Sequence, residues 1–180
     1  MTFKEKLFSD YPIPLDISIW SNALISDLDG TISSAVDELS SDIQMFEYTT
    51  IYTWITTMPV DTISIVSVKM AQQFQGNRWV KKTYDKETRT LNCRYYPALV
   101  TYTRFFNIAD LELIYGDRLR YAKAYIGEKL ANKEINLLQT VKLETDNGLV
   151  DLDALKDYAE KCAKTCEALK PAIMIYASSR

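Results

Sequence analysis

Histidine is absent from this chain of 180 residues. Imidazole is the usual general base near neutral pH and the commonest metal ligand, so its absence excludes Ser-His, Cys-His and His-metal sites. Carboxylates, lysines, tyrosines and thiols remain as the groups that carry out chemistry. The absence of histidine therefore narrows the possible enzyme classes without excluding all of them. We predict no enzymatic activity, no catalytic residue, and no cofactor or metal site.

Glycine and cysteine are both scarce. With five glycines in the whole chain, a doubly wound phosphate-binding fold, which relies on Gly-rich turns, is hard to build. The three cysteines, Cys93, Cys162 and Cys166, show neither a disulfide framework nor zinc-ligand spacing, which favours a reducing compartment. Cys162 and Cys166 stand four positions apart on an apolar stripe, so we interpret them as core residues rather than as a metal or redox pair.

A strong net charge and long apolar runs are missing as well. The net charge is −3 and the pI is near 5.1. The lysines and arginines are scattered, which argues against a surface that binds nucleic acid through its phosphates. No apolar run approaches membrane-spanning length, and residues 1–8 have too few consecutive apolar residues for a signal peptide. We therefore expect no membrane partner and no sequence-specific nucleic-acid partner.

The chain does have the size and composition of one globular domain. It is 47% apolar and 25% charged, and a chain of this length buries roughly 70% of its unfolded surface. Pro12 and Pro14 disfavour a helix, so residues 1–15 are predicted to form an extended arm. The arm is predicted to be part of a single domain that covers residues 1–180.

Residues 16–46 show the period of a helix. Apolar side chains recur there at steps of three or four, and Asp16 precedes them as a suitable N-cap. The apolar positions are Ile17, Trp20, Leu24, Leu28, Ile32, Ala35, Leu39 and Ile43. We predict one long first helix with a kink at Gly30.

Residues 47–106 are rich in Thr, Tyr and Val and change to the pattern of strands. The predicted strands cover residues 47–57, 63–68, 79–84, 90–95 and 99–106. Pro59 and Asp61 mark a turn between the first two, and Asp85-Lys86-Glu87-Thr88 joins a hairpin. The sequence therefore predicts a small antiparallel block of about five strands.

Residues 107–170 return to the helical period. One stripe runs from Leu119 to Val141, and Thr145-Asp-Asn-Gly148 is a turn signal. A final helix, capped by Asp151 or Asp153, is predicted to end at Pro171 and to leave residues 171–180 as an apolar tail able to pair as a strand. The fold class is therefore α+β, with long helices packed with a small antiparallel β-block inserted between the first helix and a C-terminal helical hairpin.

One motif points to an enzyme. The run Asp27-Leu28-Asp29-Gly30-Thr31 matches the first motif of the haloacid-dehalogenase phosphatases, and the resemblance implies Asp27 as nucleophile, Asp29 as acid/base and a carboxylate-bound magnesium ion. The apolar run before it is short, however, and the helical stripe passes through Leu28. Tyr115-Gly116-Asp117 is the only trace of a second acidic motif. We interpret Asp27 and Asp29 as part of an exposed acidic helix face.

Two further groups of residues are candidates for function. Glu144, Asp146 and Gly148 lack the ligand order of an EF-hand and are interpreted as a solvated turn. A group of aromatic side chains suits both sheet packing and a binding surface, and the sequence leaves these two alternatives open. Its members are Tyr95, Tyr96, Tyr102, Phe105 and Phe106.

The order of elements resembles that of the head-to-tail connector (adaptor or neck) proteins of tailed bacteriophages. The resemblance covers residues 17–141 and rests on a long helix, strands separated by Met58-Pro59-Val60-Asp61, a hairpin at residues 79–91, and a strand Leu99-Val-Thr-Tyr-Thr-Arg104 that leads into helices. The final helix and the tail lie outside this pattern. A baseplate or other tail position in the virion is therefore an alternative.

The resemblance implies a structural virion protein without catalysis. It would form a homo-oligomeric ring of identical subunits around the DNA channel, with portal, neck or tail subunits as further partners and with DNA only passing through the channel. Such a ring closes through heterologous contacts. The resemblance also implies that the protein is located in the virion and that viral assembly takes place in the host cytoplasm. The runner-up function is the magnesium-dependent phosphatase that uses Asp27 and Asp29.

Overall fold

The computed structural model describes residues 1–15, 25, 27–43, 46–54, 56–60, 62–70, 83–85, 87–92, 96–141 and 151–178. The chain divides into two compact units. The helical unit comprises residues 1–43 and 106–180, and the β unit comprises residues 44–105. The α+β class is confirmed, and so is the insertion of an antiparallel β-block between helices. Each unit has buried apolar side chains of its own.

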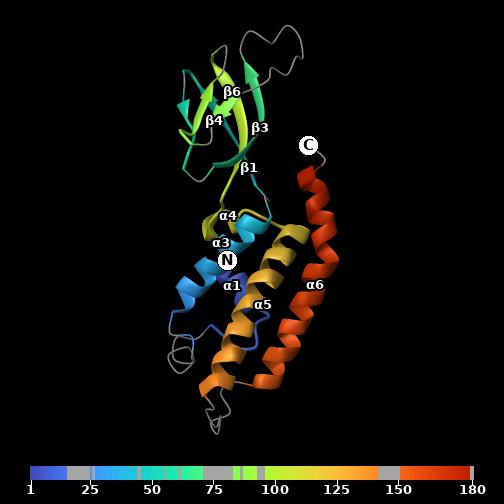
Figure 1. Ribbon diagram of the computed structural model, residues 1–180. Helices are drawn as coiled ribbons and strands as arrows, with labels where there is room; N and C mark the ends of the chain where they lie inside the picture. Colours follow the sequence, from blue (N-terminus) through green and yellow to red (C-terminus); the bar gives the residue numbers. More distant parts are fainter. Residues whose placement is uncertain are drawn as a thin grey trace. The chain divides into compact units, whose positions relative to one another are not determined.

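The helical unit contains five described helices (Figure 1). They are α1 (Phe3–Phe8), α3 (Leu28–Asp42), α4 (Ile108–Leu111), α5 (Gly116–Val141) and α6 (Leu152–Ser178). The long helices α5 and α6 lie side by side and form the predicted helical hairpin, and α3 packs on α5. Helix α1 contacts α4 and α5.

The core of the helical unit lies where these helices meet. Its fully buried large side chains come from every part of the unit: Phe3, Leu7, Ile13, Ile32, Leu39, Leu111, Ile126, Leu130 and Leu155. Close approach of α5 and α6 depends on Gly127, because a Cβ at this position would stand 2.5 Å from the Tyr158 hydroxyl oxygen. Apolar burial along this seam is the main term that stabilises the hairpin.

The β unit contains six described strands in two three-stranded antiparallel sheets. They are β1 (Glu47–Tyr52), β2 (Thr56–Thr57), β3 (Thr62–Met70), β4 (Thr83–Asp85), β5 (Thr90–Asn92) and β6 (Ala98–Arg104). One sheet has the order β1-β6-β3 and the other β2-β5-β4. The predicted strand at residues 47–57 is thus two strands that belong to different sheets, because the chain leaves the ladder at Thr53 and Trp54.

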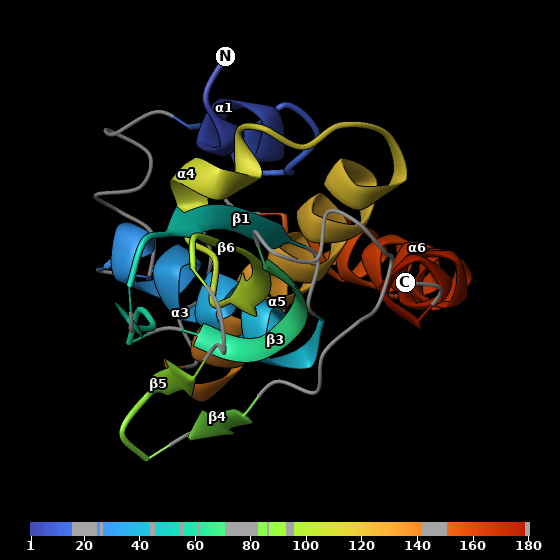
Figure 2. The same cartoon turned by 90° about the horizontal axis from the view of Figure 1, so that it is seen from above.

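A small apolar cluster joins the two sheets of the β unit, which are visible from above in Figure 2. Its buried members are Met58 and Leu91 from the β2-β5-β4 side and Val68, Ala98, Val100 and Tyr102 from the β1-β6-β3 side. The predicted hairpin is confirmed where it is described: β4 pairs with β5. Asp85 Oδ1 accepts hydrogen bonds from the backbone N–H groups of Glu87 (2.9 Å) and Thr88 (3.4 Å) in the turn. Such an Asx turn is typical of aspartate at this place.

The prediction of an extended arm at residues 1–15 is wrong at its start, because Phe3–Phe8 form helix α1. Thr2 and Glu5 make a capping box: the Glu5 N–H donates to Thr2 Oγ1 at 3.2 Å, and the Thr2 N–H donates to Glu5 Oε2 at 2.7 Å. Pro12 and Pro14 follow the helix and therefore restrict only the residues after it. The buried Phe3 and Leu7 anchor this segment in the core.

The first long helix is shorter than predicted. Helix α3 begins at Leu28 with Asp27 as its N-cap, and Ile25 is not helical. The predicted start at Asp16 lies outside the described residues. The apolar stripe is confirmed from Ile32 onward, where Ile32, Ala35 and Leu39 are buried.

The end of the chain also departs from the sequence prediction. Helix α6 continues through Pro171 to Ser178, so the described part of the predicted tail is helical instead of extended. A proline in a helix interior costs about 3 kcal/mol because it removes a backbone hydrogen bond and crowds the preceding turn. Pro171 is exposed, whereas Ile173 beyond it is 5% exposed. Burial of Ile173 supplies a physical reason for the helix to continue.

Candidate functional site

Asp27 and Asp29 lie at the N-terminus of α3. The Asp27 carboxylate accepts a hydrogen bond from the Gly30 N–H at 2.8 Å, and the Asp27 carbonyl accepts from the Thr31 N–H at 3.1 Å and from Thr31 Oγ1 at 2.7 Å. Asp29 pairs with Lys4, with 2.6 Å between Oδ1 and Nζ. Both carboxylates thus have structural partners at a helix start.

The glycine of this motif has a steric role. A Cβ at Gly30 would stand 2.0 Å from Asp27 Oδ2, so the capping carboxylate occupies the space that a side chain would need. Thr31 Oγ1 also accepts a hydrogen bond from Lys133 Nζ of α5 at 2.7 Å. Asp27, Gly30 and Thr31 of the phosphatase-like motif therefore have structural roles, in the cap of α3 and in its contact with α5.

The interface between α3 and α5 carries further polar contacts. Tyr125 donates a hydrogen bond to Asp42 at 2.9 Å, and Lys129 pairs with Glu38 at 2.6 Å. Burial and the bond to Asp42 raise the pKa of Tyr125, and the contact with Glu38 raises the pKa of Lys129. Both contacts connect one helix to the other and stabilise their packing.

Cys162 is buried and Cys166 is half-buried on α6, and both thiols are free. Burial raises the pKa of Cys166 to about 12 and also raises that of Cys162. The thiolate is the form that attacks and that binds metals, so neither cysteine is suited to such chemistry near neutral pH. Their positions agree with the interpretation as core residues. Cys93 lies outside the described residues.

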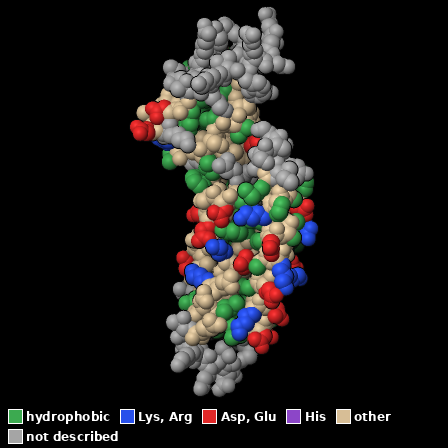
Figure 3. Space-filling model, turned by 45° about the vertical axis from the view of Figure 1, so that its right-hand side comes forward, with side chains coloured by type: hydrophobic (Ala, Val, Ile, Leu, Met, Phe, Trp, Pro, Cys, Tyr) green, Lys and Arg blue, Asp and Glu red, His purple; other side chains and the backbone are tan. Residues whose placement is uncertain are grey.

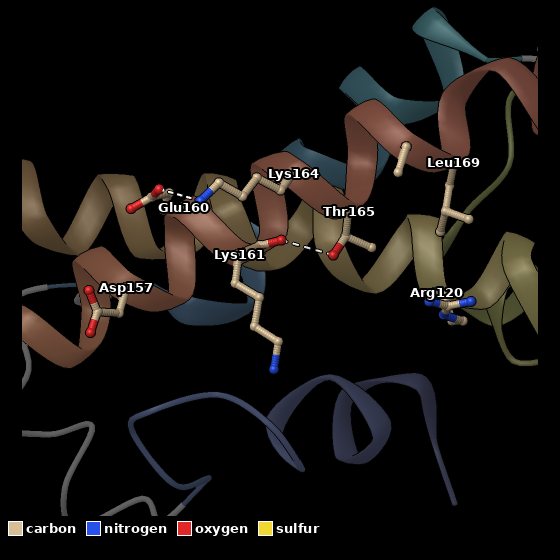
Figure 4. A pocket seen from close by; sticks show the side chains of 8 residues that line it. Arg120, Asp157, Glu160, Lys161, Lys164, Thr165 and Leu169 are labelled. Carbon is tan, nitrogen blue, oxygen red and sulfur yellow. Dashed lines mark hydrogen bonds and ion pairs between the residues drawn. The ribbon is translucent and has the colours of Figure 1, made fainter.

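A shallow groove of about 470 Å³ runs along α6 (Figure 4). Arg120 of α5 lines it together with seven residues of α6: Asp157, Glu160, Lys161, Lys164, Thr165, Ala168 and Leu169. Glu160 and Lys164 form an ion pair at 2.5 Å, and the Lys161 side chain points away from this pair. Charges of both signs line the groove, so its electrostatics favour no single class of ligand.

The most unusual feature of the surface is a set of exposed large apolar side chains. In the β unit, Ile51 is 65%, Trp54 75% and Val60 83% exposed. In the helical unit, Leu113 is 77% and Tyr115 86% exposed. On the face drawn in Figure 3, acidic and basic side chains are interspersed over the helices. Exposed apolar side chains of this size mark interaction surfaces when they lie together.

The predicted aromatic group divides between packing and exposure. Tyr102 is 6% and Phe106 2% exposed, so these two contribute to packing. Phe105 is 44% exposed, and Tyr96 is half-buried against the core of the β unit. Tyr95, and also Glu144, Asp146 and Gly148, lie outside the described residues.

Sequence patterns missed the exposure of Leu113 and Tyr115. Both stand in a short segment between Asp110 and Asp117 where the helical period breaks down. Large apolar side chains outside any periodic pattern and between carboxylates are the signal that would have indicated them. Among the described residues, no group of three or more Asp, Glu or Cys side chains is arranged to hold a metal ion.

Comparison of the chain with family models, with curated proteins and with solved structures finds no significant match. No helix in the described part of the chain is both long and apolar enough to cross a membrane.

Proposed function

We propose that this protein is a structural subunit of a homo-oligomeric assembly, and more specifically that it forms part of a ring at the head-tail connector of a tailed phage. The observation that carries the proposal is the exposure of large apolar side chains on both units, from Ile51 in the β unit to Tyr115 in the helical unit. Removal of such side chains from water on association stabilises an assembly by roughly 25 cal/mol per Å² of apolar surface.

The arrangement of the chain supports the same proposal. The β unit is inserted between α3 and α4, so the chain leaves the helical unit after Ile43 and returns at Phe106. This is the element order on which the resemblance to connector proteins rests. Strands β1 and β3 are the outer strands of their described sheet, and outer strands offer backbone groups to a neighbour.

Native mass spectrometry of the full chain tests the proposal. We expect a closed multimer with a fixed copy number, either from the chain alone or after addition of purified portal, neck or tail proteins. A chain that stays monomeric at every concentration and with every such partner contradicts the proposal. Binding to baseplate proteins alone would move the subunit to the alternative position in the tail.

An activity assay separates this proposal from the phosphatase alternative. We expect no magnesium-dependent hydrolysis of p-nitrophenyl phosphate by the wild-type protein above that of the Asp27→Asn variant. The asparagine retains an oxygen for the Gly30 N–H, so the variant keeps the helix cap while it removes the nucleophile of the alternative mechanism. Turnover that Asp27→Asn abolishes would favour the phosphatase.

A further inference from the structure

The segment between α4 and α5 presents two apolar side chains to solvent. We call it the α4–α5 corner and define it by Asp110, Glu112, Leu113, Tyr115 and Asp117. Leu113 and Tyr115 are the two apolar members, and they are 77% and 86% exposed. A tyrosine at this exposure is available as a contact residue, because its ring supplies apolar area and its hydroxyl a hydrogen bond.

Buried neighbours hold the corner in place. Leu111 is 0% and Ile114 7% exposed, so two apolar side chains close to Leu113 and Tyr115 in the sequence are buried in the helical unit. Asn107 caps α4 by accepting hydrogen bonds from the N–H groups of Ala109 (3.0 Å) and Asp110 (3.1 Å). Helix α5 begins directly after Tyr115. The exposed pair is therefore presented by a segment fixed at both ends, which lowers the entropic cost of binding.

The corner is acidic. Residues 107–117 contain three carboxylates and no lysine or arginine. Glu112 and Asp117 are exposed, whereas Asp110 is half-buried and accepts a hydrogen bond from the Asn107 N–H at 2.9 Å. Asp117 pairs with Arg120 at 3.1 Å. An apolar pair flanked by carboxylates fits a partner that combines exposed apolar side chains with positive charge.

The β unit of the same chain has this combination. Residues 44–105 contain eight lysines and arginines against four carboxylates, a net charge of +4, whereas the helical unit contains 13 against 20, a net charge of −7. The β unit also exposes Ile51, Trp54 and Val60. Contacts between like units of two copies would bring together charges of one sign, and contacts between unlike units bring together opposite charges.

We propose that the α4–α5 corner of one copy binds the β unit of the next copy. This inference rests on the proposed self-assembly and names the surfaces that carry it. The contact is heterologous, because a different surface of each copy takes part, and such contacts generate a ring when the rotation closes. Leu113 and Tyr115 supply the apolar centre of the contact, and the surrounding carboxylates face the lysines and arginines of the β unit.

Photo-crosslinking of the full chain tests the contact directly. The variant Tyr115→p-benzoylphenylalanine is mixed in equal amounts as ¹⁴N and ¹⁵N protein, assembled, irradiated and digested for mass spectrometry. We expect mixed-isotope crosslinks from position 115 to peptides within residues 44–105. The control variant Asn132→p-benzoylphenylalanine places the same group at an exposed site on α5, and we expect no such crosslinks from it. Crosslinks that are never isotope-mixed, or that reach only the helical unit, overturn the inference.

A matched pair of variants measures the strength of the contact. We expect Leu113→Ser with Tyr115→Ser to raise the concentration at half-assembly at least tenfold, which corresponds to about 1.4 kcal/mol. Met174→Ser, a change at a 50% exposed site on α6, should leave it unchanged. Glu112→Lys should weaken assembly at low salt and lose its effect as the salt concentration rises toward 1 M, where the screening length is about 3 Å. A protein that never assembles sinks the proposed function as well, whereas assembly indifferent to all corner variants sinks only the α4–α5 corner contact.

Discussion

The helical unit and the β unit bury their apolar side chains to very different degrees. Nine of the eleven fully buried large side chains belong to the helical unit, and only Met58 and Leu91 belong to the β unit. Strand β1 has no buried residue at all. The helical unit therefore derives its stability from its own core, whereas the β unit relies more on its strand pairing and leaves Ile51, Trp54 and Val60 exposed.

Hydroxyl pairs compensate in part for the thin core of the β unit. Thr49 and Thr101 hydroxyls stand 3.1 Å apart across β1 and β6, and those of Ser64 and Thr103 stand 2.7 Å apart across β3 and β6. Cross-strand pairs of this kind contribute roughly 0.2–1 kcal/mol each. The two units should therefore respond to different perturbations.

Alkaline pH should act most strongly, and mainly on the helical unit. Burial raises the pKa of Tyr121 and of Cys166 to about 12, and it raises the pKa of Tyr11, Tyr125 and Tyr158 as well. The neutral, protonated forms are favoured in the folded state. Their contribution to stability is therefore complete below the unfolded values, 9.0 for the thiol and 10.0 for the phenols, and is lost as the pH rises toward the folded values.

Urea unfolding at pH 8, 10 and 11 checks this prediction. Circular dichroism at 222 nm follows the helices, and fluorescence in a Trp20→Phe background follows the tryptophans of residues 44–105. We expect the midpoint of the helical signal to fall steeply above pH 9, and the fluorescence midpoint to fall less. Cys166→Ala should make the decline of the helical midpoint shallower. A helical midpoint that does not change between pH 8 and pH 11 would show that these groups titrate normally.

Truncation of a core side chain should affect one unit at a time. Leu155→Ala removes a fully buried side chain of α6, and Leu91→Ala removes one from the cluster of the β unit. Each change should cost about 2–5 kcal/mol because it leaves a cavity. We expect Leu155→Ala to lower the midpoint of the helical signal and Leu91→Ala to lower that of the fluorescence signal, with little effect of either on the other unit.

Exposed residues supply the controls for these truncations. Leu113→Ala in the helical unit and Ile51→Ala in the β unit delete comparable side chains at sites that are 77% and 65% exposed. We expect changes within about 0.5 kcal/mol for the unassembled chain. If Leu155→Ala shifted both signals equally, the two units would unfold as one cooperative body and the comparison between them would fail.

The limits of sequence reasoning also differ between the two units. In the β unit the high Thr and Tyr content predicted strands correctly, but which strand joins which sheet depends on long-range pairing, such as Glu47 with Thr103, that no local pattern contains. In the helical unit the period predicted α5 and α6 well. The proline rule failed at Pro171 because the burial of Ile173 in the tertiary fold outweighs the local penalty.

The candidate surfaces were harder to predict than the fold. Sequence periodicity identifies apolar residues that point inward, so Leu113 and Tyr115, which follow no period, were not recognised. The segregation of charge was hidden for a different reason. Lysines and arginines look scattered until the chain is divided at Ile43 and Phe106, because the helical unit is formed from both ends of the sequence.

The smallest expected effect concerns the start of α3. A double-mutant cycle of Asp27 and Gly30 distinguishes the contribution of the helix cap to stability from that of the surrounding packing. Asp27→Ala should cost about 0.5–2 kcal/mol, because the Gly30 N–H loses its acceptor. Gly30→Ala should also destabilise the wild-type protein, because the new Cβ displaces the Asp27 carboxylate. In the Asp27→Ala background the same change should instead stabilise by up to about 1 kcal/mol, since alanine favours a helix over glycine. Urea unfolding followed at 222 nm measures this cycle, and equal effects of Gly30→Ala in both backgrounds would mean that Gly30 does not serve the cap.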